Sequence, residues 1–265
     1  MNEASESIKT KYILFCKCGG ERISTDILNA VEEHLVTLQV SVISLSDLCG
    51  LVAQKRELRP DFFKDGAEYL VVGCYRRAMD LLFNMIGDGE KTPDYKHVNL
   101  IESSPEQAFE QMNAFCYGQK GTPSQKEIIE ESGWPSWYPL IDYTRCTACG
   151  QCADFCLFGV YEKAEGQVKV TYPQGCKNNC PACARICPAT AIIFPKYKNG
   201  GAVGGSDEID EHAEHKRQAQ DIENFLGADI YSALEKRKVT RQSIIRVEAM
   251  KQALSERDDA LKGIN

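Results

Sequence analysis

The chain has 265 residues, of which 43% are hydrophobic, and its formal net charge is -7. This length can bury the cores of more than one domain, and no apolar run approaches the roughly 18 to 20 residues that span a bilayer. The negative charge argues against a nucleic-acid partner, because phosphates select basic surfaces. The first residues lack the basic and apolar segments of a secretory signal, so we expect a cytoplasmic protein with thiols available to metal.

Residues 1–116 have the pattern of an α/β domain with a doubly wound parallel sheet. Short apolar runs predict strands at 11–15, 40–45, 69–73 and 97–102. Apolar residues at three- or four-residue spacing predict helices at 23–35, 47–56, 76–86 and 105–115. Because strands and helices alternate, the apolar helix faces should cover the sheet.

Four cysteines follow the predicted strands and are candidate metal ligands: Cys16, Cys18, Cys49 and Cys74. Ligands of open α/β sheets bind in the crevice beyond the carboxyl ends of the strands, where these thiols would meet. One hypothesis is an iron-sulfur cluster held by Cys49, Cys74 and one or both of the first two cysteines. The alternative is a set of buried thiols without a ligand, since cysteine is often buried.

The cysteine contexts in this domain resemble the N-terminal domain of the flavoprotein subunit of heterodisulfide reductases. The resemblance rests on residues 14–20, on Leu48-Cys49-Gly50 and on residues 72–77. It implies a cysteine-containing domain that sits beside ferredoxin modules. The flavin domain of that family is missing, because no predicted strand is followed by a G-x-G-x-x-G turn.

Residues 117–139 have the glycine- and proline-rich composition of a linker. Trp134 and Trp137 lie within it. We expect these two side chains to pack the following domain against its neighbour rather than to bind a ligand.

The next domain, at residues 140–197, contains two runs of four cysteines with the spacing of metal ligands. The runs are Cys146-x2-Cys149-x2-Cys152-x3-Cys156 and Cys176-x3-Cys180-x2-Cys183-x3-Cys187-Pro188. Thiolates separated by two residues can converge from one loop on three corners of a 4Fe-4S cube. A zinc ribbon fits less well, because it pairs two C-x2-C motifs or adds histidines, and a disulfide framework would require an oxidising compartment.

Residues 141–194, about a fifth of the chain, resemble the bacterial two-cluster 4Fe-4S ferredoxins. In that arrangement the fourth cysteine of each run ligates the other cluster. The resemblance therefore implies two ligand sets: Cys146, Cys149, Cys152 and Cys187 for one cluster, and Cys176, Cys180, Cys183 and Cys156 for the other. The chain departs from the family where Leu157 replaces a proline and where residues 177–179 replace a two-residue spacer.

Residues 198–265 are expected to form a linker followed by a charged helical tail. Glycines at 200–205 lie outside any strand-helix unit and indicate a flexible linker. Two apolar stripes follow, made by Ile222, Phe225, Leu226, Ile230 and Leu234 and by Ile244, Val247, Met250 and Leu254. They are expected to pack within the chain or to dock on a partner helix.

These features favour an electron-transfer protein with two 4Fe-4S clusters, and a third if the N-terminal thiols bind one. The expected partner is a redox protein, alone or in a larger oxidoreductase complex. No catalytic residue is predicted, since phosphate-loop, H-E-x-x-H and G-x-S-x-G motifs are missing. Two alternatives remain, a catalytic component whose N-terminal cluster has an open iron site and a redox-sensing scaffold.

Overall fold

The structure, a computed structural model, describes residues 10–18, 22–54, 62–86, 92–119, 123–129 and 132–226. The chain divides into two compact units, 1–214 and 215–265. Residues 215–226 of the second unit belong to helix α8 (Glu211–Leu226). Both predicted apolar stripes lie outside the residues whose side chains are described. In the described part of the chain, no helix has the length and apolar character needed to cross a membrane.

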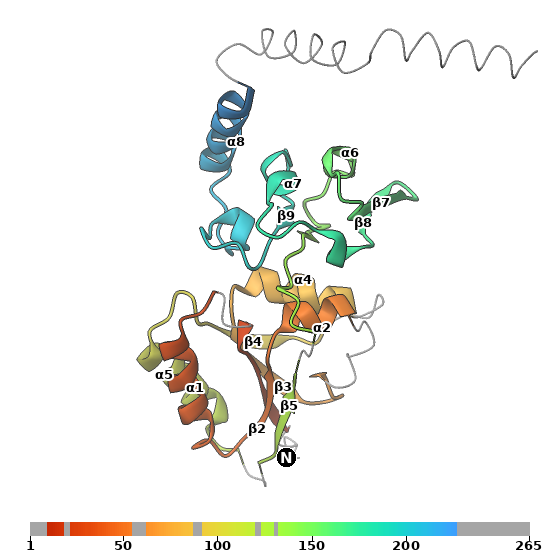
Figure 1. The fold of residues 1–265 in the computed structure, drawn as a ribbon. Coiled ribbons are helices and arrows are strands. Elements are labelled where there is room, and N and C mark those ends of the chain that lie inside the picture. The colour runs from red at the N-terminus through yellow and green to blue at the C-terminus, as the bar shows by residue number, and fades with distance from the viewer. Residues whose placement is uncertain are drawn as a thin grey trace, which may run out of the picture. The chain divides into compact units, whose positions relative to one another are not determined.

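The first unit contains a parallel five-stranded sheet with the order β4-β3-β1-β2-β5 (Figure 1). Its strands are β1 (Lys11–Cys16), β2 (Ser41–Leu45), β3 (Glu68–Gly73), β4 (Tyr95–Asn99) and β5 (Gln125–Ile128). The central strands are buried along most of their length, as expected for a parallel sheet with both faces covered. A mixed α/β fold with a parallel sheet is therefore confirmed.

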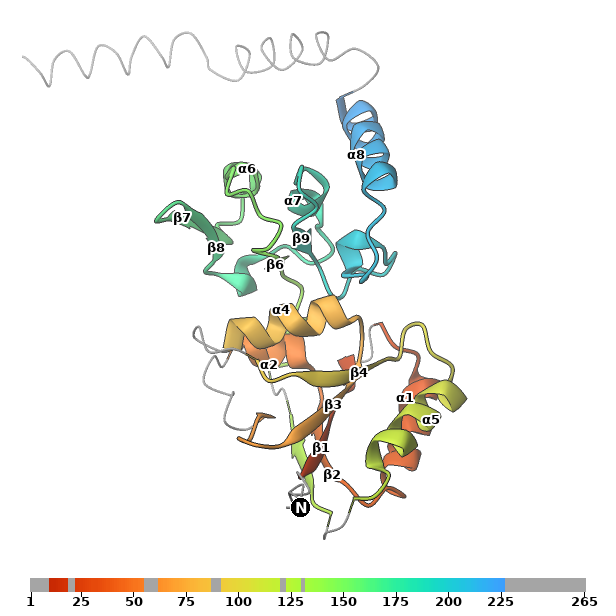
Figure 2. The ribbon, with the colours of Figure 1, turned by 180° about the vertical axis from the view of Figure 1, so that it is seen from behind.

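Helices cover both faces of this sheet (Figures 1 and 2). Helices α1 (Thr25–Leu35) and α5 (Pro105–Cys116) lie on one face, and α2 (Leu48–Gln54) and α4 (Arg76–Ile86) lie on the other. Successive residues of β1 alternate between the two cores. Ile13 and Phe15 pack in the core beneath α1 and α5, whereas Leu14 and Cys16 pack in the core beneath α2 and α4. The thiol of Cys16 therefore faces α2 and α4.

The helix boundaries follow local signals in the sequence. Ser24 caps α1 by accepting the N–H of Ile27, and Ser104 and Gln107 form a capping box at α5. Both α1 and α4 bury residues three or four apart, the spacing that predicted them. Helix α1 buries Ile27, Leu28, Val31 and Leu35, and α4 buries Ala78, Met79, Leu82, Phe83 and Ile86.

Strand β5 lies inside the segment that the sequence indicated to be a linker. It pairs with β2 at the edge of the sheet. Three of its four residues are exposed, so the strand lacks the apolar alternation that would have revealed it. Trp134 and Trp137 follow it and pack in different cores. Trp134 stacks on Tyr138 with ring centroids 5.6 Å apart, and Trp137 stacks on Phe194 at 5.0 Å.

The cysteine runs lie among short elements that follow the sheet. Strand β6 (Leu140–Ile141) pairs with β9 (Ile192–Ile193), and β7 (Tyr161–Ala164) pairs with β8 (Gln167–Val170), both antiparallel. Two helical turns carry parts of the runs, α6 (Gln151–Phe155) and α7 (Ala182–Arg185). The β6–β9 pair brings the beginning and the end of this region together.

The glycine-rich segment at 200–205 was predicted to be a flexible linker, and the structure differs. The segment forms a turn, η3 (Ala202–Gly204), in which Val203 is buried. The N–H of Phe194 donates to the carbonyl of Val203 at 2.7 Å. Gly205 has a φ of 92° and leaves no free space for a side chain, because a Cβ there would lie 3.3 Å from Ala78 of α4. The glycines therefore permit close packing.

Candidate metal centres

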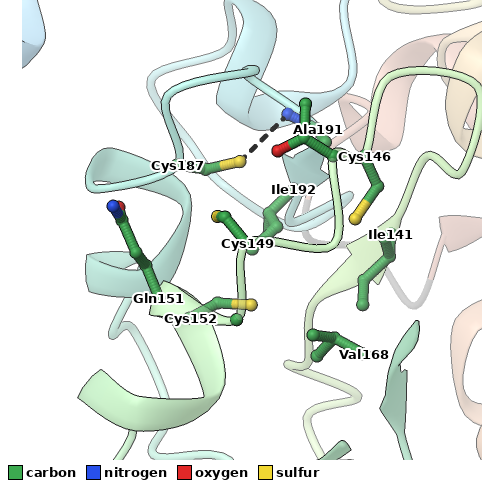
Figure 3. A pocket seen from close by; sticks show the side chains of 11 residues that line it. Ile141, Cys146, Cys149, Gln151, Cys152, Val168, Cys187, Ala191 and Ile192 are labelled. Carbon is green, nitrogen blue, oxygen red and sulfur yellow. Dashed lines mark hydrogen bonds between the residues drawn. The ribbon is translucent and has the colours of Figure 1, made fainter. Parts of the chain in front are cut away.

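Four cysteines from the two runs line one pocket (Figure 3). The first run supplies three of them and the second supplies its last member: Cys146, Cys149, Cys152 and Cys187. Apolar side chains from three different strands form part of the wall, namely Ile141 of β6, Val168 of β8 and Ile192 of β9. The strand pairing thus brings residues far apart in the chain around these thiols.

The loop that carries the first run begins at Asp142. The carbonyl of Asp142 accepts the N–H of Cys146 at 2.9 Å. Its carboxylate accepts the amide of Thr144 at 3.1 Å and the hydroxyl of Thr144 at 2.6 Å. Ala148 and Gly150 have left-handed φ values of 56° and 78°. These turns fold the chain back between the cysteines, so that all three can face one pocket.

Two backbone amides point at sulfur atoms in this pocket. Ala148 N–H donates to Cys146 Sγ and Ala191 N–H to Cys187 Sγ, both at 3.4 Å, and Figure 3 marks the second bond. Burial, followed by the charges of Cys187 and Cys146, raises the pKa of Cys152 to about 11. A bound cation would favour the thiolate form. Four thiols in a partly apolar pocket with amide donors at sulfur fit an iron-sulfur cluster.

The remaining cysteines of the two runs form a second set: Cys156, Cys176, Cys180 and Cys183. Burial, and then the charges of Cys180 and Cys156, raise the pKa of Cys176 to about 12. Burial is also the main cause that raises the pKa of Cys183 to about 12, and Cys176 and Cys156 add to it. The hydroxyl of Tyr161 donates to Cys183 Sγ at 3.0 Å. This set again combines three cysteines of one run with the last of the other.

The longer spacer of the second run is accommodated in a turn. The N–H of Cys180 donates to the carbonyl of Lys177 at 3.2 Å. Asn179 has a φ of 59°, which asparagine tolerates better than most residues. The additional residue therefore leaves Cys176 and Cys180 in the same set.

The four N-terminal cysteines also lie together, at the carboxyl edge of the parallel sheet. Each is at most 4% exposed: Cys16, Cys18, Cys49 and Cys74. Burial, and then the charge of Cys18, raise the pKa of Cys16 to about 12. Burial likewise raises the pKa values of Cys49 and Cys74, and each of these thiols lies close enough to Cys18 to be affected by its charge. The four thiols thus lie near one another beyond the ends of the strands.

Close backbone packing supports this N-terminal site. A Cβ on Gly73 would lie 2.4 Å from Met79 Cε and 3.3 Å from Cys16 Cβ, so a side chain there would displace Met79 and crowd Cys16. Cys18 has a φ of 57°, a left-handed conformation that is uncommon outside glycine. The loop after β1 is therefore bent to bring its second cysteine beside the others.

No disulfide joins any of the thirteen cysteines, all of which the structure describes. Cys116 stands apart from the three sets, at the end of α5 beside the α1 and α5 core. Among the described residues, no three histidine, cysteine or acidic side chains surround the position of a single ion. In a 4Fe-4S cube, each of the four irons takes its own thiolate.

Comparison with individual known proteins identifies the family of this chain, although no family model matches it. The chain is 52% identical over 147 residues to an uncharacterized ferredoxin of Methanocaldococcus jannaschii, and the match covers 54% of this chain and 94% of that protein. The chain belongs to the ferredoxin family.

This ferredoxin is also similar to pyruvate synthase subunits named PorD. The subunit of Methanothermobacter marburgensis is 29% identical over 76 residues, which are 29% of this chain and 88% of the subunit. The one of Methanocaldococcus jannaschii is 35% identical over 60 residues, which are 22% of this chain and 67% of the subunit. Together with the family, these relatives identify an iron-sulfur electron-transfer protein.

Three side chains that this ferredoxin places beside its thiols were not predicted from the sequence. Tyr161 bonds to Cys183, and Asp47 and Lys196 lie beside the N-terminal cysteines. Asp47 had a local signal, because an aspartate that directly precedes a helix is a typical N-cap. Lys196 had none, since its partner Asp47 lies 149 residues away in the chain.

Proposed function

We propose that this ferredoxin carries two 4Fe-4S clusters and relays electrons to an oxidoreductase partner. The observation that supports this most strongly is the pocket of Figure 3, in which three cysteines of the first run meet Cys187 of the second. A single-run site would have used Cys156 in its place. The exchange of fourth ligands is the rule in two-cluster ferredoxins.

The proposed ligand sets are Cys146, Cys149, Cys152 and Cys187 for one cluster and Cys176, Cys180, Cys183 and Cys156 for the other. Each cluster, when bound, accepts and returns one electron. The residues around it control the charge at sulfur. The amides of Ala148 and Ala191 and the hydroxyl of Tyr161 donate to sulfur, and such bonds favour the more negative, reduced form.

The surface near Cys156 offers a route for electrons to a partner. Phe155, Leu157 and Phe158 flank this cysteine and are 46%, 90% and 41% exposed. Exposed apolar side chains beside a proposed ligand fit a contact surface that excludes water. The PorD relatives are subunits of a pyruvate synthase, which supports an oxidoreductase complex as the partner. We propose a cytoplasmic location, where the thiols would stay reduced and available to metal.

Electron transfer can be tested with the reduced protein. Anaerobic protein, reduced with dithionite and freed of excess reductant, should reduce added cytochrome c while its own visible absorbance returns to the oxidised level. Protein stripped of iron by a chelator is the control and should transfer nothing. If dithionite leaves the visible spectrum of the iron-loaded protein unchanged, the proposed relay is wrong.

A second candidate function adds a cluster at the N-terminal thiols and makes the protein a catalytic oxidoreductase component. The proximity of Cys16, Cys18, Cys49 and Cys74 at the sheet edge favours it. The resemblance of this domain to the flavoprotein subunit of heterodisulfide reductases supports the same interpretation. The remaining alternative, a redox-sensing scaffold, depends on tail residues that lie outside the described ranges.

The double variant Cys49→Ala/Cys74→Ala separates these candidates. If the N-terminal thiols hold a cluster, iron content should fall by the irons of that cluster, about four if it is a cube. Acid-labile sulfide should fall in parallel, and the ferredoxin clusters should remain. Equal iron and sulfide in the variant and the wild type would exclude the N-terminal cluster and leave a two-cluster electron carrier.

A further inference from the structure

Lys196 extends from the cysteine-run region into the N-terminal thiol site. Its Nζ lies 2.7 Å from Asp47 Oδ2 and 3.3 Å from the carbonyl oxygen of Cys18. The side chains of Lys196 and Asp47 are only 5% and 8% exposed. Lys196 follows strand β9 by three residues, whereas Asp47 directly precedes α2. The ion pair therefore connects the cysteine-run region to the parallel-sheet region beside the N-terminal thiols.

Asp47 is held from two sides. Its Oδ1 accepts the N–H of Cys49 at 3.2 Å, while Oδ2 accepts Lys196. The carboxylate is thus fixed between the backbone of one cysteine and the ammonium group. Because Asp47 bonds to both groups, it ties Lys196 to the first turn of α2, which carries Cys49.

A buried ion pair is costly, so its location calls for a reason beyond stability. Removing two charges from water costs several kcal/mol for each ion, and apolar substitutes are often as stable. The ammonium group of Lys196 lies between Asp47 and the backbone of Cys18, within the thiol site. Thiolates that hold a bound group there would add negative charge beside it and so offset the cost of burying it.

Arg22 adds a second cation to the same site. Its guanidinium donates to the carbonyls of Pro195 and Tyr197, on either side of Lys196, and lies over the ring of Tyr75. Its positive charge opposes the burial that raises the pKa values of Cys18 and Cys74. Apart from the thiols themselves, the charged groups among the described side chains that act on this site are Arg22, Lys196 and Asp47. Two cations and one carboxylate leave a positive excess.

We propose that Lys196 is the counter-ion of thiolates at the N-terminal site, and that it raises the reduction potential of the group these thiolates bind. This inference rests on the N-terminal cluster of the second candidate function. Reduction adds one electron, supplied by the chemical titrant, and one negative charge, without forming or breaking a bond. A fixed positive charge stabilises that more negative form. Lys196 is a positioning residue, since it acts through the thiolates.

Replacing Lys196 by a neutral side chain tests this role. In Lys196→Gln, we expect the midpoint potential of the N-terminal centre to become more negative. The reduction equilibrium constant should fall at least tenfold, about 59 mV for one electron. Lys196→Arg, which keeps the charge, should stay close to the wild type. The measurement is a redox titration followed by electron paramagnetic resonance, and the N-terminal signal is the one lost in Cys49→Ala/Cys74→Ala.

Two further variants test the direction of the potential shift and supply a control. Asp47→Asn should raise the same potential, because it removes a negative charge, and it carries the test if Lys196→Gln does not fold. Lys17→Gln is the matched control, since Lys17 lies between Cys16 and Cys18 in the chain but pairs outward with Glu32 and Glu127. It should leave the potential nearly unchanged.

Different outcomes would contradict the role of Lys196 and the N-terminal cluster on which that role depends. A centre that is present but equally reducible in the wild type, Lys196→Gln and Asp47→Asn would overturn the role of Lys196 and leave the N-terminal cluster standing. Equal shifts in Lys17→Gln and Lys196→Gln would also overturn it. If Cys49→Ala/Cys74→Ala loses no iron, the N-terminal cluster is wrong and the inference falls with it.

Discussion

Cys187→Ala should lose one of the two proposed 4Fe-4S clusters, about four irons and four sulfides per chain. Cys187 belongs to the second run in sequence but lines the pocket of the first. Its variant should therefore share the residual spectrum of Cys146→Ala. Cys156→Ala should instead resemble Cys176→Ala, because those thiols act on each other in the second set. Electron paramagnetic resonance of the reduced variants measures this pairing.

Cys116→Ala is the matched control for these variants. Cys116 is a half-buried thiol at the end of α5, beside a different core. Its replacement should leave iron, sulfide and the spectrum of the reduced protein unchanged. If Cys187→Ala resembles Cys176→Ala in place of Cys146→Ala, the exchange of ligands between the runs is wrong.

Arg77→Met should lower the free energy of unfolding by about 3 to 5 kcal/mol, the cost of breaking a buried ion pair from one side. Arg77 Nε lies 3.1 Å from Asp142 Oδ2, and the two side chains are 11% and 9% exposed. The same guanidinium donates to the carbonyls of Thr190 at 3.0 Å and Ala202 at 3.3 Å. It thereby joins α4 to the loop that begins the first cysteine run. The variant leaves Asp142 buried without this partner.

The effect of Arg77→Met should depend on pH. Burial alone would raise the pKa of Asp142, but hydrogen bonds from Thr144 and Arg77 outweigh it and hold the pKa below its usual value. A lowered carboxylate pKa stabilises the fold above the unfolded-state value, about 3.9, and this stabilisation is lost as pH falls through the folded-state value. The difference between wild type and variant should therefore be large at pH 7 and shrink below about pH 4.

Anaerobic urea unfolding, followed by circular dichroism, measures this loss, and Arg76→Met is its control. Arg76 is the neighbouring residue of α4, and its ion pair with Asp80 is nearly half exposed on both sides. Such pairs contribute about 1 kcal/mol or less. Equal destabilisation by Arg76→Met and Arg77→Met would contradict the account of the buried pair.

Local patterns in the sequence predicted much of the fold and of the candidate site. The strands at β1 to β4 and helices α1, α2, α4 and α5 follow apolar periodicity and caps that lie within a few residues of one another. The spacing of the cysteine runs is equally local. This spacing indicates iron-sulfur chemistry without the help of any tertiary contact.

The features that the sequence did not reveal depend on distant partners. β5 is a polar edge strand that exists because it pairs with β2. The glycine-rich turn is ordered because Val203 and Gly205 pack against neighbours from elsewhere in the chain. Lys196 and Arg77 find their carboxylates 149 and 65 residues away. Such charge pairs leave no periodic signal, so only the three-dimensional structure identifies them.

The most direct test of the central claim is the number of electrons that the cysteine-run region accepts. Controlled-potential coulometry of anaerobic Cys49→Ala/Cys74→Ala, taken down to about -700 mV, covers the range of known iron-sulfur potentials. Two 4Fe-4S clusters predict an uptake of about two electrons per chain, returned on oxidation, with iron and sulfide in equal amounts. Uptake of no electrons, with bound zinc and no sulfide, would contradict the assignment of these eight cysteines to electron transfer.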